Sequence, residues 1–350
     1  MKQWIKPLVP GNGHSRHLSY DEAVAAAHAI ARGEASEAQT ASLLTALRIR
    51  GESSAEAGAF ADVFRKYIQP YASFSDSVYA VEGVRLKSHF PVETVVSLLL
   101  ASVGIPIVLQ GGVESAPDGG YTAGELLTEL GWAEASSHSS WEEKFHFNRI
   151  GFLRSEQVCP PLAQLRAVQR QIGIPTIAES VERMLNPLQS RTLVTGVKDR
   201  NEAEPCELFS KAGFQSAIFI QGMDGSENLP LHKSSMVRRV TEGVEQTMVV
   251  DPLLLGFRRE PLMKRTKKQQ MEIFLRILQG HDAEELEVER EHIILNTGMR
   301  LVWFERVQTY EEGFMVARQL LQRREGEKRL ALLTGAHSSA GISGTNRKAN

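Results

Sequence analysis

Apolar positions in the first part of the chain recur every three to four residues, the spacing of amphipathic helices. Ser19 followed by Glu22 forms a capping-box pattern, which predicts a helix over residues 23–32. Two further helices are predicted over residues 36–50 and 54–69, closed by a glycine and a proline. Small residues dominate these apolar faces, which favours a compact helical bundle.

After about residue 76 the pattern changes to short β-branched runs that alternate with helical stretches. Buried strands are predicted at 78–84, 105–109, 191–197 and 217–220. Helices are predicted at 92–103, 162–171, 177–185 and 204–212. Strand–helix–strand repetition predicts a mostly parallel sheet covered by helices.

These patterns predict an α/β protein with two unequal domains. A small all-helical domain is expected over residues 1–75, joined by helices from about 155–187. The larger α/β domain, with its mostly parallel central sheet, is expected over 76–154 and 188–335. The tail, 336–350, is rich in Ser, Gly and Asn and is predicted to be disordered.

The composition narrows the functional classes only slightly. The chain has 350 residues, 42% of them hydrophobic, and a formal net charge of -2, so nucleic-acid or membrane binding would need a local patch. Cys159 and Cys206 are far apart and have no metal-ligand spacing, which suggests a reduced, cytoplasmic setting. No signal-like or membrane-spanning run is evident.

Several local sequences occur in an order that resembles one known family, over roughly residues 18 to 334. They are Leu18-Ser-Tyr-Asp-Glu, Gly173-Ile-Pro-Thr-Ile, Gly222-Met-Asp-Gly-Ser-Glu, Leu295-Asn-Thr-Gly and Tyr310-Glu-Glu-Gly. Together they resemble the anthranilate phosphoribosyltransferases of glycosyl transferase family 3, which are related in fold to pyrimidine nucleoside phosphorylases. The resemblance implies displacement of pyrophosphate from phosphoribosyl pyrophosphate by an aromatic amine. That reaction needs backbone N–H groups, cations and metal ions around the phosphates.

The family's first phosphate-binding feature is a Gly-Thr-Gly-Gly-Asp loop after the first strand of the sheet. The corresponding stretch here, 82–91, keeps only Gly83. Side chains that could still attract an anion there are Arg85, Lys87, Ser88 and His89, the last at a strand-to-helix loop where α/β sheets bind ligands. An ordinary polar loop is the alternative interpretation, and on chemistry alone we favour it.

A second family segment, Lys-His-Gly-Asn-Arg, corresponds to Gln110-Gly-Gly-Val-Glu114 in this chain. The lysine becomes neutral and the arginine becomes acidic, which would weaken phosphate binding by roughly several kcal/mol at an effective dielectric near 20. The remaining phosphate-binding candidates in this segment are Gly111, Gly112 and Ser115; the glycines also fit a simple turn.

The family's magnesium-binding acidic pair is also altered. It corresponds to Glu227 and Asn228 here, after Asp224. Asp224 and Glu227 could hold one Mg²⁺ through water, because magnesium often uses only one or two carboxylates. A solvated loop is the alternative interpretation.

The acceptor-binding residues depart from the family as well. The family reads the anthranilate carboxylate with the first residue of a basic pair, which is Gln169-Arg170 here, so only Arg170 remains as a cation. A Gly-Pro in the family's next loop becomes Glu182 and Arg183, which predicts continuous helix and a changed cleft lining. Tryptophan-pathway activity is therefore not expected.

One basic run suggests a different function. Its six cations lie within eleven residues before a predicted helix: Arg258, Arg259, Lys264, Arg265, Lys267 and Lys268. Such a run can contact a phosphate backbone, although charge runs are more often solvated surface. A divergent branch that resembles this chain lacks the phosphate loop and is associated with nucleic-acid binding by basic helix-end patches.

Two hypotheses follow from the sequence. The first is a divergent glycosyl or phosphoribosyl transferase with an altered substrate, which would bind a phosphorylated sugar and Mg²⁺ in the cleft between the domains. The second is a non-catalytic protein that binds nucleic acid through the basic run. A homodimer formed through the helical part is expected in either case and would bring two basic runs together. No membrane partner is expected.

Overall fold

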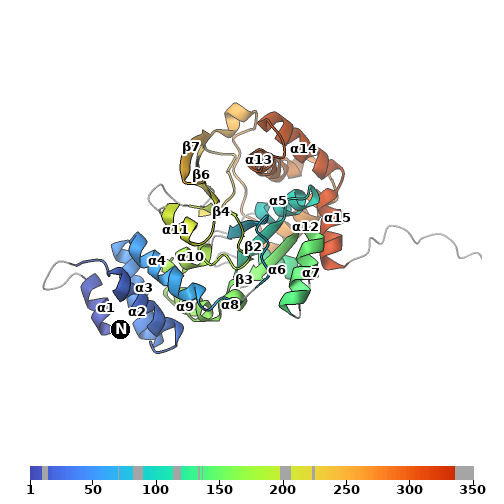
Figure 1. Ribbon diagram of the computed structural model, residues 1–350. Helices are drawn as coiled ribbons and strands as arrows, with labels where there is room; N and C mark the ends of the chain where they lie inside the picture. Colours follow the sequence, from blue (N-terminus) through green and yellow to red (C-terminus); the bar gives the residue numbers. More distant parts are fainter. Residues whose placement is uncertain are drawn as a thin grey trace, which may run out of the picture.

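The computed structural model describes most of the 350-residue chain (Figure 1). The described residues are 1–9, 15–69, 71–81, 90–112, 120–132, 135, 137–197, 206–222 and 225–335. The predicted tail, 336–350, lies outside them.

The N-terminal helices form a bundle at one end of the molecule (Figure 1). Its elements are α1 (Lys2–Ile5), η1 (Lys6–Leu8), α2 (Tyr20–Ala31), α3 (Glu37–Arg50) and α4 (Ser54–Arg65). The three long helices each begin with a capping box, in which a serine hydroxyl and a Glu or Gln side chain exchange hydrogen bonds with backbone N–H groups. Local sequence therefore fixes where these helices begin.

The α/β part is built on one seven-stranded sheet. Its strands are β1 (Val78–Val81), β2 (Ile107–Gly111), β3 (Ile150–Arg154), β4 (Thr192–Gly196), β5 (Ser216–Ile220), β6 (Ser235–Thr241) and β7 (Val244–Val250). Their order across the sheet is β3-β2-β1-β4-β5-β6-β7. The pairs from β3 to β5 are parallel, and β6 and β7 are added antiparallel. The expected mostly parallel sheet is confirmed.

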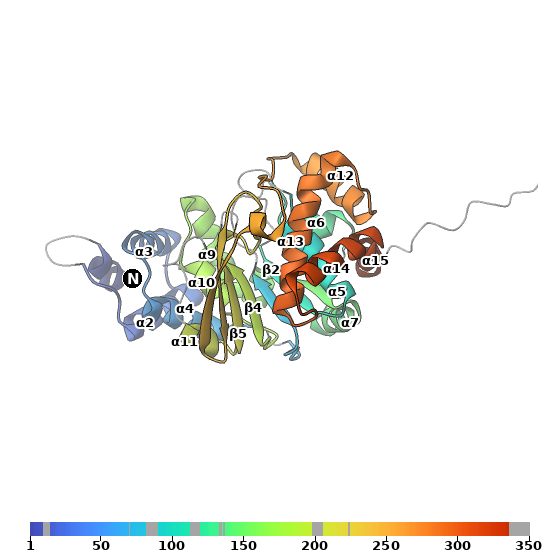
Figure 2. The same cartoon turned by 90° about the horizontal axis from the view of Figure 1, so that it is seen from above.

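Helices cover both faces of the sheet, as the view from above shows (Figure 2). One face carries α5 (Val92–Ser102), α6 (Ala123–Glu129), α12 (Lys267–Leu278), α13 (Glu287–Trp303), α14 (Tyr310–Gln322) and α15 (Glu325–Thr334). The bundle side carries α9 (Pro160–Ile172), α10 (Ile177–Arg183) and α11 (Cys206–Lys211). Short α8 (Ser155–Val158) follows β3, and α7 (His138–Asn148) lies beside that edge strand.

Two hydrophobic cores result, one on each face. In β1, Val78 and Ala80 belong to one core, whereas Tyr79 and Val81 belong to the other. This alternation follows from the period of two along a strand. Helices α9 and α10 pack against α2, α3 and α4, so the second core continues into the bundle.

The structure confirms the expected class, a helical bundle beside a larger α/β unit. The second strand lies at 107–111 instead of 105–109. Only 78–81 of the predicted 78–84 strand falls within the described residues and is strand there. Strand β3 and the β6–β7 hairpin were not predicted. Within the described residues, none of the helices has the length and apolar character needed to span a bilayer.

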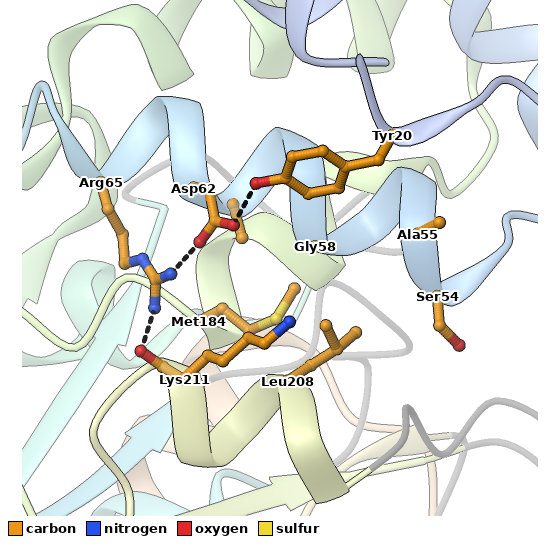
Figure 3. Close-up of a pocket in the computed structure, with 10 residues that line it drawn as sticks. Tyr20, Ser54, Ala55, Gly58, Asp62, Arg65, Met184, Leu208 and Lys211 are labelled. Carbon is orange, nitrogen blue, oxygen red and sulfur yellow. Dashed lines mark hydrogen bonds and ion pairs between the residues drawn. The ribbon is translucent and has the colours of Figure 1, made fainter. Parts of the chain in front are cut away.

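A small cavity of about 60 Å³ marks where the bundle meets α11 (Figure 3). The Tyr20 hydroxyl donates to the Asp62 carboxylate at 2.6 Å. Arg65 also pairs with Asp62 and donates to the backbone oxygen of Lys211 at 2.9 Å. A Cβ on Gly58 would lie only 2.8 Å from a methyl of Leu208, so α4 approaches α11 closely. These contacts hold α4, and with it the bundle, against α11.

This junction predicts a pH dependence at the alkaline end. The hydrogen bond to Asp62, with burial, raises the pKa of Tyr20 to about 12. Because the folded state favours the neutral phenol, this contribution to stability is complete below the unfolded pKa of about 10 and is lost as pH rises toward 12. Urea unfolding measures how much the free energy of unfolding falls between about pH 9 and about pH 11. This decrease should be smaller for Tyr20→Phe than for the wild type. Equal losses would mean that this bond does not titrate with folding.

Candidate functional site

The carboxyl ends of the parallel strands mark the candidate site. Strands β1, β2 and β3 progress toward one edge of the sheet, and β4 and β5 progress toward the other. The order therefore reverses between β1 and β4, the position at which open α/β sheets bind ligands. Residues 82–89 after β1 and 198–205 after β4 lie outside the described residues. The described site consists of the segment after β5 and the ends of β2 and β3.

The segment after β5 folds back tightly over the end of β4. A Cβ on Gly196 would lie 2.1 Å from the Gly225 carbonyl oxygen and 2.3 Å from the carbonyl carbon of Ser226. A Cβ on Gly222 would lie 2.1 Å from the carbonyl oxygen of Ser226. Neither position has room for a side chain, so the two glycines are needed for the backbone to approach this closely. The fold thereby places residues 225–228 at the switch point.

Helix α13 holds the continuation of this segment through side chains. The Asn296 amide forms two hydrogen bonds with the Leu229 backbone, accepting from its N–H at 2.8 Å and donating to its carbonyl at 3.0 Å. His292 Nε2 accepts from the Leu231 N–H at 3.2 Å, while Nδ1 lies 2.8 Å from the Val288 carbonyl. This arrangement fits a neutral histidine with its proton on Nδ1.

A buried arginine completes this attachment. Arg300 donates to the Glu227 carbonyl at 2.7 Å and to the Asn296 side-chain oxygen at 2.9 Å. Burial lowers the pKa of Arg300 to about 10, against the opposing effect of the Glu227 and Glu93 carboxylates. Asn228 donates to Glu93 at 3.1 Å. Glu227, one predicted metal ligand, therefore lies beside a buried positive charge.

A second buried charge cluster lies at the end of β3. Arg166 of α9 pairs with Glu182 of α10, and the Ser155 hydroxyl donates to the same carboxylate. Burial raises the pKa of Glu182, and Arg166 opposes that shift. Burial alone would lower the pKa of Arg166, but the carboxylates of Glu182, Glu179 and Glu156 raise it above its usual value. Three carboxylates therefore act on the Arg166 guanidinium group, and Glu182 contacts it directly.

Polar residues near this cluster are mostly engaged internally. Gln110 is fully buried, and its side-chain oxygen accepts from the Tyr79 hydroxyl. Gln169 is also buried and accepts from Thr176 at 3.2 Å. Arg170 lies on the exposed side of α9. The predicted acceptor-reading position is thus a neutral, buried amide, and α10 runs through Glu182 as continuous helix.

Of the other residues predicted to bind phosphate or metal, some lie at the site and the rest lie outside the described residues. Gly111 is the last residue of β2, and a Cβ on Gly112 would lie 3.6 Å from Glu156 Oε1, an ordinary contact. Both are therefore at the site, next to the cluster at the end of β3. The remaining predictions, Gly83, Arg85, Lys87, Ser88, His89, Ser115 and Asp224, lie outside the described residues. Within the described residues, no cluster of three or more His, Cys, Asp or Glu could hold a metal ion.

The basic run lies around the start of α12 (Figure 2), where Lys267 reaches Glu125 in the first turn of α6, the helix that follows β2. Four of its cations have acidic partners: Arg258 with Glu287, Arg259 with Asp251, Arg265 with Glu289 and Lys267 with Glu125. Lys264 and Lys268 are exposed and form no ion pair with any residue that the structure describes. The run is therefore partly neutralised by the fold.

Sequence reasoning did not single out the two buried arginines. Arg166 follows Leu165 on the buried face of α9, and a charge on such a face is a detectable signal of a buried pair. His292, Asn296 and Arg300 recur every four residues on α13, so they share one stripe of an otherwise apolar helix. Both signals were present, but the partners lie far away in sequence.

Comparisons with known proteins agree with this architecture. Residues 2–68 match the glycosyl transferase family, helical bundle domain, and residues 83–326 match the glycosyl transferase family, a/b domain. An anthranilate phosphoribosyltransferase from Pelotomaculum thermopropionicum is 28% identical over 323 residues, covering 91% of each chain.

Solved structures show the same fold. An anthranilate phosphoribosyltransferase from Thermus thermophilus superposes with a TM-score of 0.76 at 22% identity, covering 95% of this chain and 98% of that one. The enzyme from Saccharomyces cerevisiae in complex with PRPP and Mg superposes with a TM-score of 0.79 at 16% identity, covering 95% and 96%. The chain therefore belongs to glycosyl transferase family 3, the family of the anthranilate phosphoribosyltransferases.

Proposed function

We propose that this chain is a divergent phosphoribosyl- or glycosyltransferase homologue that binds a phosphorylated sugar but does not use anthranilate as acceptor. The buried Arg166–Glu182 ion pair at the end of β3 is the main support for this proposal. Glu182 stands where the family has a glycine in its acceptor-side loop. A glycine there would leave open space and an uncharged backbone. The buried ion pair fills that space with charged side chains.

The electrostatics of this position disfavour an aromatic acid. Anthranilate carries a carboxylate, which the family pairs with an arginine that is Gln169 here. The carboxylates of Glu182, Glu179 and Glu156 all act on the guanidinium group of Arg166, which already pairs with Glu182, so Arg166 is not available to bind the carboxylate of an acceptor. An acceptor without negative charge suits the cleft better.

Different features support the binding of a phosphorylated sugar. The Saccharomyces cerevisiae relative is described in complex with PRPP and Mg. In this chain the tight packing of Gly196 and Gly222 against residues 225–226 brings backbone to the switch point, where phosphates bind α/β folds. Glu227 would offer a carboxylate oxygen to Mg²⁺, which takes one or two carboxylates and completes its shell with water and phosphate oxygens. Arg300 would compete with Mg²⁺ for the Glu227 carboxylate, because its positive charge already lies beside it.

Calorimetry separates the two halves of this proposal. Titration with PRPP and Mg²⁺ should give saturable binding that Asp224→Ala abolishes, whereas Glu311→Ala, on the first turn of α14, should leave it unchanged. Anthranilate should give no saturable heat with or without PRPP. Absence of PRPP binding would overturn the sugar half, and tight anthranilate binding would overturn the acceptor half.

The basic run supports a second candidate, nucleic-acid binding. Lys267 and Lys268 occupy the first turn of α12, which has no acidic residue. Cations at a helix N-terminus oppose the helix dipole, at a cost of roughly 0.3–1 kcal/mol each. A phosphate bound there would offset that repulsion and would meet exposed backbone N–H groups. A homodimer would present two such runs and raise avidity.

Salt dependence tests this candidate. Binding of a short DNA duplex should weaken steeply between two salt concentrations, and Lys264→Ala with Lys268→Ala should reduce the slope of log affinity against log salt by roughly two. Arg323→Ala, which removes an exposed cation just after α14, is the matched control. Salt-insensitive binding, or an equal effect of the control, would exclude the run as the contact surface.

A further inference from the structure

A cavity of about 400 Å³ lies beside the edge strand β3 and borders the end of that strand at Arg154. Its lining comes from α7, the segment after α6, the segment before β1, and β3 with the start of α8. Figure 1 shows α6 and α7 next to β3. Its lining residues include Tyr71, Trp132, His138, Trp141, Phe152 and Arg154. None of them belongs to the Arg166–Glu182 cluster or to the segment after β5. Four aromatic rings from separate parts of the chain thus converge on one space.

Trp141 is held firmly in the wall of this cavity. Its indole N–H donates to the Phe152 carbonyl at 3.0 Å, satisfying a backbone group of the edge strand. A Cβ on Gly151 would lie 2.6 Å from a carbon of the Trp141 ring, so the ring rests directly on the backbone. Phe145 stacks against it with ring centroids 5.0 Å apart. Trp141 cannot move inward without losing all three contacts.

Phe152 is fixed in the same way. A Cβ on Gly124 would lie 2.7 Å from two carbons of the Phe152 ring. Trp132 packs edge-to-face against Phe152, with centroids 5.9 Å apart. These walls are braced from behind, so the space is pre-formed, as ligand pockets of roughly 300–1,000 Å³ usually are.

Polar groups accompany the rings. Tyr71 contacts His138 with ring centroids 4.2 Å apart. Burial and the Glu142 carboxylate raise the pKa of Tyr71 to about 12, so its hydroxyl remains a donor at neutral pH. Within the described part of the chain, neither the Tyr71 hydroxyl nor the Trp132 indole N–H has a hydrogen-bond partner. The cavity therefore offers aromatic surface together with unused donors.

We propose that this cavity binds a heteroaromatic base, either free or as a nucleoside. A base has a flat π surface that packs against aromatic side chains, and ring nitrogens and carbonyls at its edge that accept from N–H and O–H donors. A purely apolar ligand would leave both donors unsatisfied, which costs binding free energy. A base can stack on the aromatic side chains and accept hydrogen bonds from the donors of the cavity lining.

Titration with adenine and adenosine tests the proposal. The chain has four tryptophans, two of which line the cavity, so binding should quench tryptophan fluorescence and should also give saturable heat in calorimetry. Tighter binding of adenosine would identify the nucleoside as ligand, and tighter binding of adenine the free base. No saturable binding of either at millimolar concentration would overturn the proposal. So would equal affinity for benzyl alcohol, which has a ring but no heteroaromatic edge.

Variants locate the binding. Tyr71→Ala should weaken it roughly tenfold through the lost stacking surface. Trp132→Phe keeps a ring but removes the donor, and should weaken it roughly threefold. Phe147→Ala removes an aromatic of the same helix α7 that is 71% exposed and outside the cavity, and should change nothing. If folded Tyr71→Ala and Trp132→Phe proteins, checked by circular dichroism, bind as the wild type does, the base lies elsewhere.

Discussion

Replacing Glu182 with alanine will destabilise the folded protein by about 3–5 kcal/mol, because it leaves a buried guanidinium group without its closest partner. Arg166 is only 7% exposed, and its pairing with Glu182 offsets the cost of removing both charges from water. The Ser155 hydroxyl loses its acceptor at the same time. Urea unfolding followed by circular dichroism measures the change directly.

Two comparison proteins make this result specific. The double variant Arg166→Met with Glu182→Met removes both charges and fills the space, so it should recover most of the lost stability. Glu143→Ala, on the exposed side of α7, should stay within roughly 0.5 kcal/mol of the wild type. A double variant as unstable as Glu182→Ala would show that the pair is not the source of the loss.

Replacing Arg300 with methionine should be comparably costly, about 3–5 kcal/mol. The change removes the positive charge beside the Glu227 and Glu93 carboxylates and leaves the Glu227 carbonyl without this donor. The segment from Glu227 to Leu231 should then open more often. Hydrogen exchange of the Leu229 and Leu231 amides, which bond to α13 side chains, should accelerate more than exchange in the sheet.

The control for Arg300 is Arg323→Met, which removes an exposed cation just after α14. It should leave both stability and exchange nearly unchanged. Global destabilisation by Arg300→Met with no preferential exchange at Leu229 and Leu231 would contradict the role assigned to Arg300. The arginine would then stabilise the core in general and not this segment.

The sequence contained enough information for the fold class because the relevant signals are local. Ser19 with Glu22 forms both bonds of its capping box, as the spacing predicts. Strand β3 was missed because Gly151 interrupts its apolar run, and that glycine is required where Trp141 lies on the backbone. The β6–β7 hairpin had a usable signal: alternating residues around Glu242-Gly243, both of which adopt positive φ.

The site was predictable only in part. The resemblance predicts Gln169 in place of an acceptor-reading arginine and Glu182 in place of a glycine, and both residues could be read from the sequence. The partner of Glu182 could not, because Arg166 is sixteen residues away and the contact depends on how α9 and α10 pack. The same holds for Arg300, which lies 73 residues from the segment it binds. Long-range pairs of this kind depend on tertiary packing. The sequence can show a charged residue on a buried face, but it does not show which residue is its partner.

The most direct test is an assay of anthranilate consumption with PRPP and Mg²⁺, followed by the loss of anthranilate fluorescence. The proposed function predicts that the wild-type protein consumes no anthranilate, because it assigns Gln169 to the position of the family's acceptor-reading arginine and Glu182 to that of a glycine. An anthranilate phosphoribosyltransferase such as the Thermus thermophilus relative, assayed in parallel, serves as the positive control. Steady consumption by the wild type at a rate similar to that control would contradict the proposed function.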